Sequence, residues 1–143
     1  MPRASKVRLE EKELKNLTEH FCYLVSSLTN STEAENFLHE FLTKEEKIML
    51  TKRLVLFMML KRNYPDPIIK GALKISYETI RTYKNQFPSK NEEFQKTINK
   101  LVNRERAKEL FEKLNKLLKP LDLALQSKSN MKARSKFASG NWD

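Results

Sequence analysis

Apolar residues along most of this chain recur at spacings of three and four, the period of an amphipathic α-helix. An early example is the set Leu14, Leu17, Phe21, Leu24, Val25 and Leu28. Long alternating runs of Val, Ile and Thr, which indicate β-strands, are missing from the sequence. Glycine is scarce, at Gly71 and Gly140. The pattern therefore predicts an all-α protein.

Capping and stop residues divide this pattern into separate helices. Three pairs have the spacing of a capping box, namely Thr32 with Glu35, Thr43 with Glu46, and Ser89 with Glu92. Pro65 and Pro67 interrupt the pattern because proline donates no backbone hydrogen bond and restricts the residue before it. We expect helices at about 14–28, 32–42, 44–62, 67–73 and 76–87, followed by a long helical region from residue 89.

The third of these helices is apolar almost all round from Leu54 to Leu60. A helix with such a surface is normally buried. Either the rest of this chain covers it, or a partner chain does, and the sequence leaves both explanations open.

Charge and cysteine content limit the classes of protein to consider. The 28 Lys and Arg against 18 Asp and Glu give a net charge of +10, which favours polyanionic partners such as nucleic acid. The single Cys22 forms no internal disulfide and fits a reducing cytosol. The N-terminus lacks the apolar core of a signal peptide. We therefore expect a cytoplasmic protein with no membrane partner.

No constellation of residues predicts catalysis, a metal or a cofactor. His20 and Cys22 are two positions apart, which places them on different faces of a helix, and His39 is isolated. The two glycines are too far apart to form a phosphate-binding loop. We expect that the protein is not an enzyme.

The stretch IIKGALKISYETIRTYKNQF, residues 68–87, has the pattern of a helix-turn-helix. Its apolar positions are Ile69, Leu73, Ile75 and Ile80. The start of its second helix predicts base readout by Tyr77, Glu78, Arg81 and Thr82. Contacts to DNA phosphates are predicted for Lys70, Lys74, Tyr83 and Lys84. Lys74 stands where a glycine would ease the turn, and the pattern alone fits a merely packed hairpin equally well.

A longer span resembles the Trp repressor superfamily. TKEEKIMLTKRLVLFMMLKRNYPDPIIKGALKISYETIRTY, residues 43–83, combines a T-x-x-E opening, an arginine within a long apolar helix, a loop and two short helices. FCYLVSSLTNSTEAENFLHEFL, residues 21–42, resembles the N-terminal helices of repressor-like members. The resemblance covers about Leu14 to Phe87. It implies a helical bundle that forms an intertwined homodimer, and a bacterial-type regulator that binds double-stranded operator DNA.

The same resemblance bears on tryptophan as a corepressor. In the tryptophan-responsive members two arginines sandwich the indole, and a small residue follows the second arginine. Arg53 stands at the first position, but Thr82 occupies the second and the bulky Tyr83 follows it. We expect no tryptophan corepressor. Arg53 is then a vestigial effector position, with a structural role such as pairing with the carboxylate of Glu46 or one of a partner chain.

We divide the chain into a Trp repressor-like domain at 8–88, a C-terminal helical extension at 89–126 and a basic tail at 127–143 that we expect to be disordered. The extension either docks on the domain or presents its leucines, Leu110 to Leu121, to another protein. The tail either follows the DNA backbone or has no partner. A protein-interaction module and an RNA-binding protein therefore remain alternatives to a DNA-binding regulator.

Overall fold

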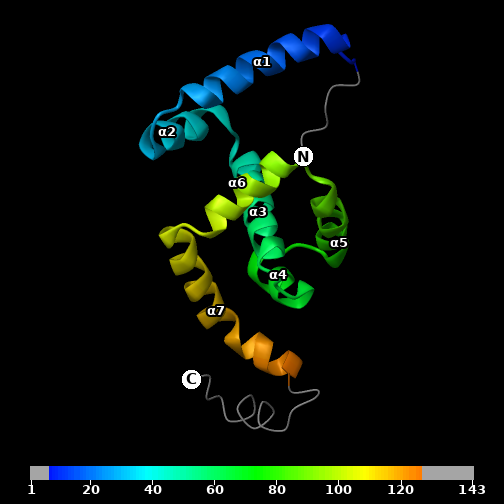
Figure 1. The fold of residues 1–143 in the computed structure, drawn as a ribbon, viewed down its shortest axis with the longest axis vertical. Helices are drawn as coiled ribbons and strands as arrows, with labels where there is room; N and C mark the ends of the chain where they lie inside the picture. Colours follow the sequence, from blue (N-terminus) through cyan, green and yellow to red (C-terminus); the bar gives the residue numbers. More distant parts are fainter. Residues whose placement is uncertain (1–6, 127–143) are drawn as a thin grey trace. The chain divides into compact units, whose positions relative to one another are not determined.

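The computed structural model describes residues 7–126, and within that range it is helical and contains no strand (Figure 1). Its elements are α1 (Glu11–Ser27), α2 (Ser31–Phe41), α3 (Lys44–Lys61), α4 (Asp66–Leu73), α5 (Tyr77–Gln86), the 3-10 helix η1 (Phe87–Ser89), α6 (Glu92–Val102) and α7 (Glu105–Gln126). The predicted all-α fold is confirmed. Among residues 7–126, none of the helices combines the length and the apolar character that a membrane span requires. The predicted basic tail lies outside the described residues.

The chain forms two compact units, Met1–Thr51 and Lys52–Asp143, and the boundary between them falls inside α3. The first unit holds α1, α2 and the start of α3. The second holds the rest of α3 and all later elements. The domain boundaries that we place after residues 88 and 126 stay predictions.

The first unit has helices but almost no interior. Neither α1 nor α2 contains a buried residue. The ring of Phe41 stacks on Phe37 and Phe21, with centroids 5.1 and 5.9 Å apart. Many of its large apolar side chains are exposed, among them Leu14, Leu17, Phe21, Val25, Leu38, Phe41, Ile48 and Leu50.

The second unit surrounds a continuous hydrophobic core. Five consecutive residues of α3, Leu56 to Leu60, are buried. Helices α4 to α7 contribute Ile68, Ile69, Leu73, Ile80, Ile98, Val102, Ala107 and Phe111 to the same cluster. Of the segment Leu54 to Leu60 that we expect to be buried, the chain itself therefore buries Leu56 to Leu60, whereas Leu54 is exposed.

Helix starts follow the predicted chemistry at one of the three capping boxes. Glu46 Oε2 accepts from the Thr43 N–H at 2.9 Å, and Thr43 Oγ1 accepts from the Glu46 N–H at 3.2 Å. The predictions at Thr32 and Ser89 are wrong. Asn30 caps α2 and Asn91 caps α6, each accepting a backbone N–H at 2.8 Å. Asparagine caps a helix as well as serine or threonine does, so the cap lies at a neighbouring residue.

The C-terminal helices pack on the helix-turn-helix region. Ala107 and Phe111 of α7 are buried in the core beside α4. The polar stretch Asn103 to Arg106 contains the break between α6 and α7. Pro120 lies inside α7 and does not end it. Of the two roles that we considered for the extension, docking on the domain is the one seen for these residues.

Candidate nucleic-acid interface

Helices α4 and α5 form a hairpin through the short turn at Lys74 to Ser76. Lys74 adopts the left-handed conformation, with φ 52° and ψ 50°, and its N–H donates to Lys70 O at 3.0 Å. Ser76 Oγ then accepts from the Thr79 N–H at 3.1 Å and starts α5. Both the turn and the predicted cap are present. A lysine in this conformation costs about 1 kcal/mol relative to glycine.

The inner side of the hairpin is apolar, as the sequence pattern predicts. Ile69, Leu73 and Ile80 are buried, and Ile75 packs half-buried against the same core. These contacts hold α5 against the core of the second unit, so the opposite side of the helix is exposed.

The outer side of α5 carries the four residues predicted for base readout. Tyr77, Glu78, Arg81 and Thr82 are all exposed. Their spacing of one, three and one places them on one face of the helix near its N-terminal end. Thr82 Oγ1 donates to Glu78 O at 2.9 Å, so part of its hydrogen-bonding capacity is used within the helix. Their contacts with bases stay predictions.

The lysines predicted to contact phosphates differ in their surroundings. Lys70 Nζ lies 4.3 Å from the centroid of the Tyr77 ring, which joins a predicted phosphate contact to a predicted base contact. Lys84 Nζ lies 2.8 Å from Asp66 Oδ1, so Lys84 forms an ion pair with this carboxylate. Lys74 is exposed. The Asp66–Lys84 pair spans 18 residues, and sequence spacing could not reveal it.

Tyr83 faces the protein interior more than the other candidates do. Its ring is half-buried and makes an edge contact with Phe57, at a centroid distance of 5.5 Å. The guanidinium carbon of Arg53 lies 5.8 Å from the centre of the Tyr83 ring. Glu46, which we considered as a partner of Arg53, is engaged with Thr43. The partner of Arg53 seen among the described residues is the ring of Tyr83, the residue that follows Thr82 at the second arginine position.

An open cavity of about 490 Å³ adjoins this contact. Its lining residues are Arg53, Phe57, Tyr83, Gln86, Lys90, Asn91 and Phe94. The side chain of Tyr83 occupies space here that a smaller residue would leave to a ligand. Among the residues whose side chains the structure describes, no group of three His, Cys, Asp or Glu is placed to hold a metal ion.

The fold and this surface define a helical bundle with a helix-turn-helix and a C-terminal helical extension. The family model of the Trp repressor protein matches residues 16–102, well over half of the chain. The protein belongs to this family. No curated protein and no solved structure matches the chain.

Proposed function

We propose that this protein is a sequence-specific DNA-binding transcriptional regulator that acts in the cytoplasm by occupying an operator. The observation that carries the proposal is the exposed N-terminal face of α5, held outward by a buried apolar inner side. An exposed helix of this kind fits the major groove, where side chains at its start reach base edges. Membership of the Trp repressor family supports the same function.

The regulator is proposed to be a homodimer. The exposed apolar side chains of α1 and α2 support this, because a water-exposed surface of that kind is typical of an interaction site. A second copy would cover the same residues on both chains, as two-fold symmetry requires. A dimeric reader binds paired half-sites in DNA.

The position of Tyr83 supports the proposal that this regulator does not use tryptophan as a corepressor. Its ring already contacts Arg53 and Phe57, so an indole would have to displace it. We expect no heat of binding when tryptophan is titrated into the protein in a calorimeter. A measurable heat is expected when Tyr83→Gly is combined with Thr82→Arg, which supplies the second arginine. Saturable binding of tryptophan to the unaltered protein would contradict this part of the proposal.

The test of DNA recognition is selection of duplexes from a random pool, followed by comparison of the enriched sequence with a scrambled one over a salt series. We expect paired half-sites to be enriched. If the protein binds both duplexes with equal affinity, and this affinity only falls as the salt concentration rises, the surface binds DNA nonspecifically and the proposal is wrong.

Two variants then separate base contacts from phosphate contacts. Arg81→Ala is expected to cost about 1–3 kcal/mol and to relax preference at one base pair. Lys74→Asn removes a charge and keeps a residue that tolerates the left-handed turn, so it should weaken all duplexes similarly. Lys100→Gln, on the exposed surface of α6, is the charge-matched control. Equal losses on every sequence for Arg81→Ala would refute its assignment to a base.

A further inference from the structure

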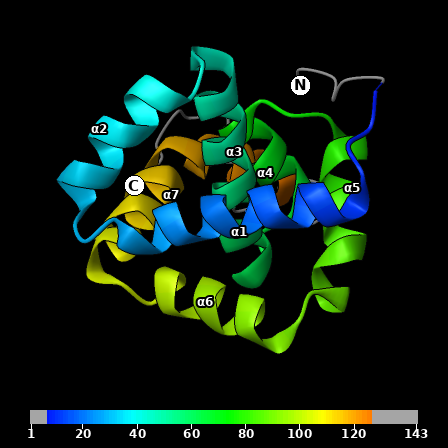
Figure 2. The ribbon, with the colours of Figure 1, turned by 90° about the horizontal axis from the view of Figure 1, so that it is seen from above.

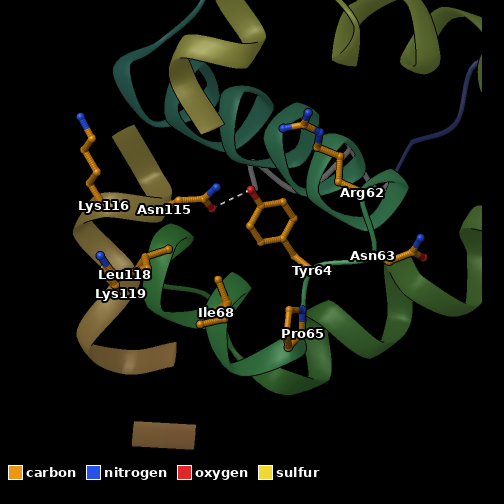
Figure 3. A pocket seen from close by; sticks show the side chains of 9 residues that line it. All are labelled: Arg62, Asn63, Tyr64, Pro65, Ile68, Asn115, Lys116, Leu118 and Lys119. Atoms are coloured by element: carbon orange, nitrogen blue, oxygen red, sulfur yellow. Dashed lines mark hydrogen bonds between the residues drawn. The ribbon is translucent and has the colours of Figure 1, made fainter. Parts of the chain in front are cut away.

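A second cavity, of about 580 Å³, lies between α7 and the turn that joins α3 to α4 (Figure 3). Its lining residues are Arg62, Asn63, Tyr64, Pro65, Ile68, Asn115, Lys116, Leu118 and Lys119. Tyr64 lies in the middle of the view, and its hydroxyl donates to Asn115 Oδ1 at 2.9 Å. Part of the cavity is therefore built by α7, which begins beyond the segment that matches the family model.

The walls of this cavity are held in place by specific contacts. Asn63 has a φ of 56°, and it closes α3 by donating its N–H to Leu60 O at 3.0 Å. The next N–H, of Tyr64, donates to Met59 O at 3.1 Å, which completes a Schellman-type helix end. The Tyr64 ring stacks on Phe111, with centroids 5.6 Å apart. The cavity thus has a defined wall on the α3–α4 side and on the α7 side.

The charge of this cavity has one sign. Arg62, Lys116 and Lys119 line it, and none of the lining residues that the structure describes is acidic. The Arg62 guanidinium carbon lies 4.3 Å from the centre of the Phe111 ring. None of the three cations forms an ion pair with a carboxylate within the described part of the chain. Lys116 and Lys119 are exposed, so a ligand that enters the cavity from solvent can reach their charges.

The rest of the lining combines apolar and hydrogen-bonding groups. Ile68 is buried and Leu118 is half-buried, and Pro65 and the Tyr64 ring add further apolar surface. The amides of Asn63 and Asn115 offer donors and acceptors. A volume of this size is in the range of small-molecule sites. The lining favours a ligand with a flat or branched apolar body and an anionic group.

We propose that this cavity binds a small organic anion, with its apolar body against Tyr64, Ile68 and Leu118 and its charged group near Lys116 and Lys119. The ligand bridges α7 and the turn that leads into the helix-turn-helix. The proposal does not depend on DNA recognition by α5.

The position of the cavity separates it from the proposed DNA surface. Ile68 lines the cavity, whereas Lys70 contacts Tyr77 at the start of α5. Two positions along a helix differ by roughly 200°, so these side chains leave α4 on opposite sides. In Figure 1, α5 lies on one side of α4 and α7 on the other, and in Figure 2 α7 begins on the side of α4 away from α5. A small ligand therefore fits the cavity better than a DNA phosphate held by α5.

The test uses naphthalene-2-sulfonate as the probe and neutral 2-naphthalenemethanol as its uncharged counterpart. Each is titrated into ¹⁵N-labelled full-length protein, and amide shifts are followed by NMR. We expect saturable shifts at Asn63, Tyr64 and Asn115 with the sulfonate, and at least tenfold weaker binding of the alcohol. Absent shifts at these residues, or equal binding of both compounds, would overturn the proposal.

A pair of double variants supplies the control. Lys116→Gln with Lys119→Gln removes two of the lining charges and is expected to weaken sulfonate binding at least tenfold. Lys100→Gln with Lys113→Gln removes the same charge from exposed positions outside the cavity and should leave binding unchanged. Equal weakening in both double variants would mean that net charge alone attracts the probe and would refute a built site.

One further result would assign the cavity to nucleic acid. If a DNA duplex shifts the same amides, and Lys116→Gln with Lys119→Gln weakens duplex binding while the sulfonate does not bind, the cavity is a backbone contact and the proposal is wrong. Because the sulfonate titration contains no DNA, it gives the same answer whether or not the protein recognises an operator.

Discussion

The two units of this molecule use the same kind of helix with different results. The helices α1 and α2 have well-formed apolar faces but no buried residue. In the second unit, by contrast, Leu56 to Leu60 of α3 are buried in a core to which α4 to α7 contribute. Amphipathic spacing thus predicts a helix equally well in both units. It does not predict what covers the apolar face, because that depends on elements distant in the sequence.

The largest expected effect concerns the core of the second unit. Phe111 is 1% exposed and contacts Tyr64 and Arg62. Phe111→Ala should lower the free energy of unfolding by about 3–5 kcal/mol, because it removes buried apolar surface and leaves a cavity. Urea denaturation followed by circular dichroism measures the change.

Leu117→Ala is the matched control for this prediction, since Leu117 is on the same helix but 77% exposed. Its effect should stay within about 0.5 kcal/mol. If both variants lower the free energy of unfolding by similar amounts, the inner face of α7 does not contribute to the core. The second unit would then differ less from the first than its packing indicates.

The next effect concerns the exposed face of the first unit. Leu17 is 56% exposed in one chain, so Leu17→Lys should scarcely alter the stability of a monomer. If a second copy covers this face, the dissociation constant of the dimer should rise by about 100-fold, because a buried lysine has no partner there. Sedimentation equilibrium measures the constant.

Asn16→Lys adds the same charge on another side of α1 and should leave the association unchanged. A protein that is monomeric before any substitution would contradict the proposed homodimer, because no second copy would then cover the apolar face of α1.

A smaller effect is expected at the turn of the hairpin. Lys74→Gly relieves the left-handed strain and should raise the free energy of unfolding by about 0.5–1 kcal/mol. Lys74→Ala removes the same charge but keeps a Cβ atom, so it should not stabilise the protein. Thermal unfolding of both variants separates strain from charge, and equal stabilities would show that strain is not what limits this turn.

The smallest effect lies at the start of α2. The backbone N–H of Thr29 donates to the Glu33 carboxylate at 3.0 Å and lowers its pKa below the ordinary value of 4.5, and the Thr29 hydroxyl adds to the effect. Ionised Glu33 therefore stabilises α2 above pH 4.5, and this contribution is lost as the pH falls through the lowered pKa. An NMR titration should give a midpoint below 4.5 that moves back toward the ordinary value in Thr29→Ala. Because Thr29→Ala keeps the backbone N–H, an unchanged midpoint would refute the contribution assigned to the Thr29 hydroxyl.

Local signals in the sequence predicted much of the fold. The Thr43 capping box, the Ser76 cap and the four apolar positions of the hairpin depend on neighbours within a few residues, and all are present. The two wrong caps show the limit of the same signals. Asn30 lies three residues before Glu33, so two overlapping boxes compete, and the sequence does not say which one the chain adopts.

Contacts between distant residues could not be predicted in this way. Tyr64 and Asn115 are 51 positions apart, and no periodic pattern joins them. The cation contact between Lys70 and Tyr77 and the ion pair of Lys84 with Asp66 also arise only when α4 and α5 fold together. Local sequence signals were therefore enough to predict the helix-turn-helix. The contacts of single side chains could not be predicted, because they depend on how distant elements pack.

The position of Phe111 also has a consequence for synthesis on the ribosome. The segment that matches the Trp repressor family ends at residue 102, but Ala107 and Phe111 complete the core that surrounds α3. A nascent chain that has released only the matched segment still lacks part of its interior. The second unit is expected to finish folding only after the first turns of α7 have left the exit tunnel, later than the family boundary would indicate.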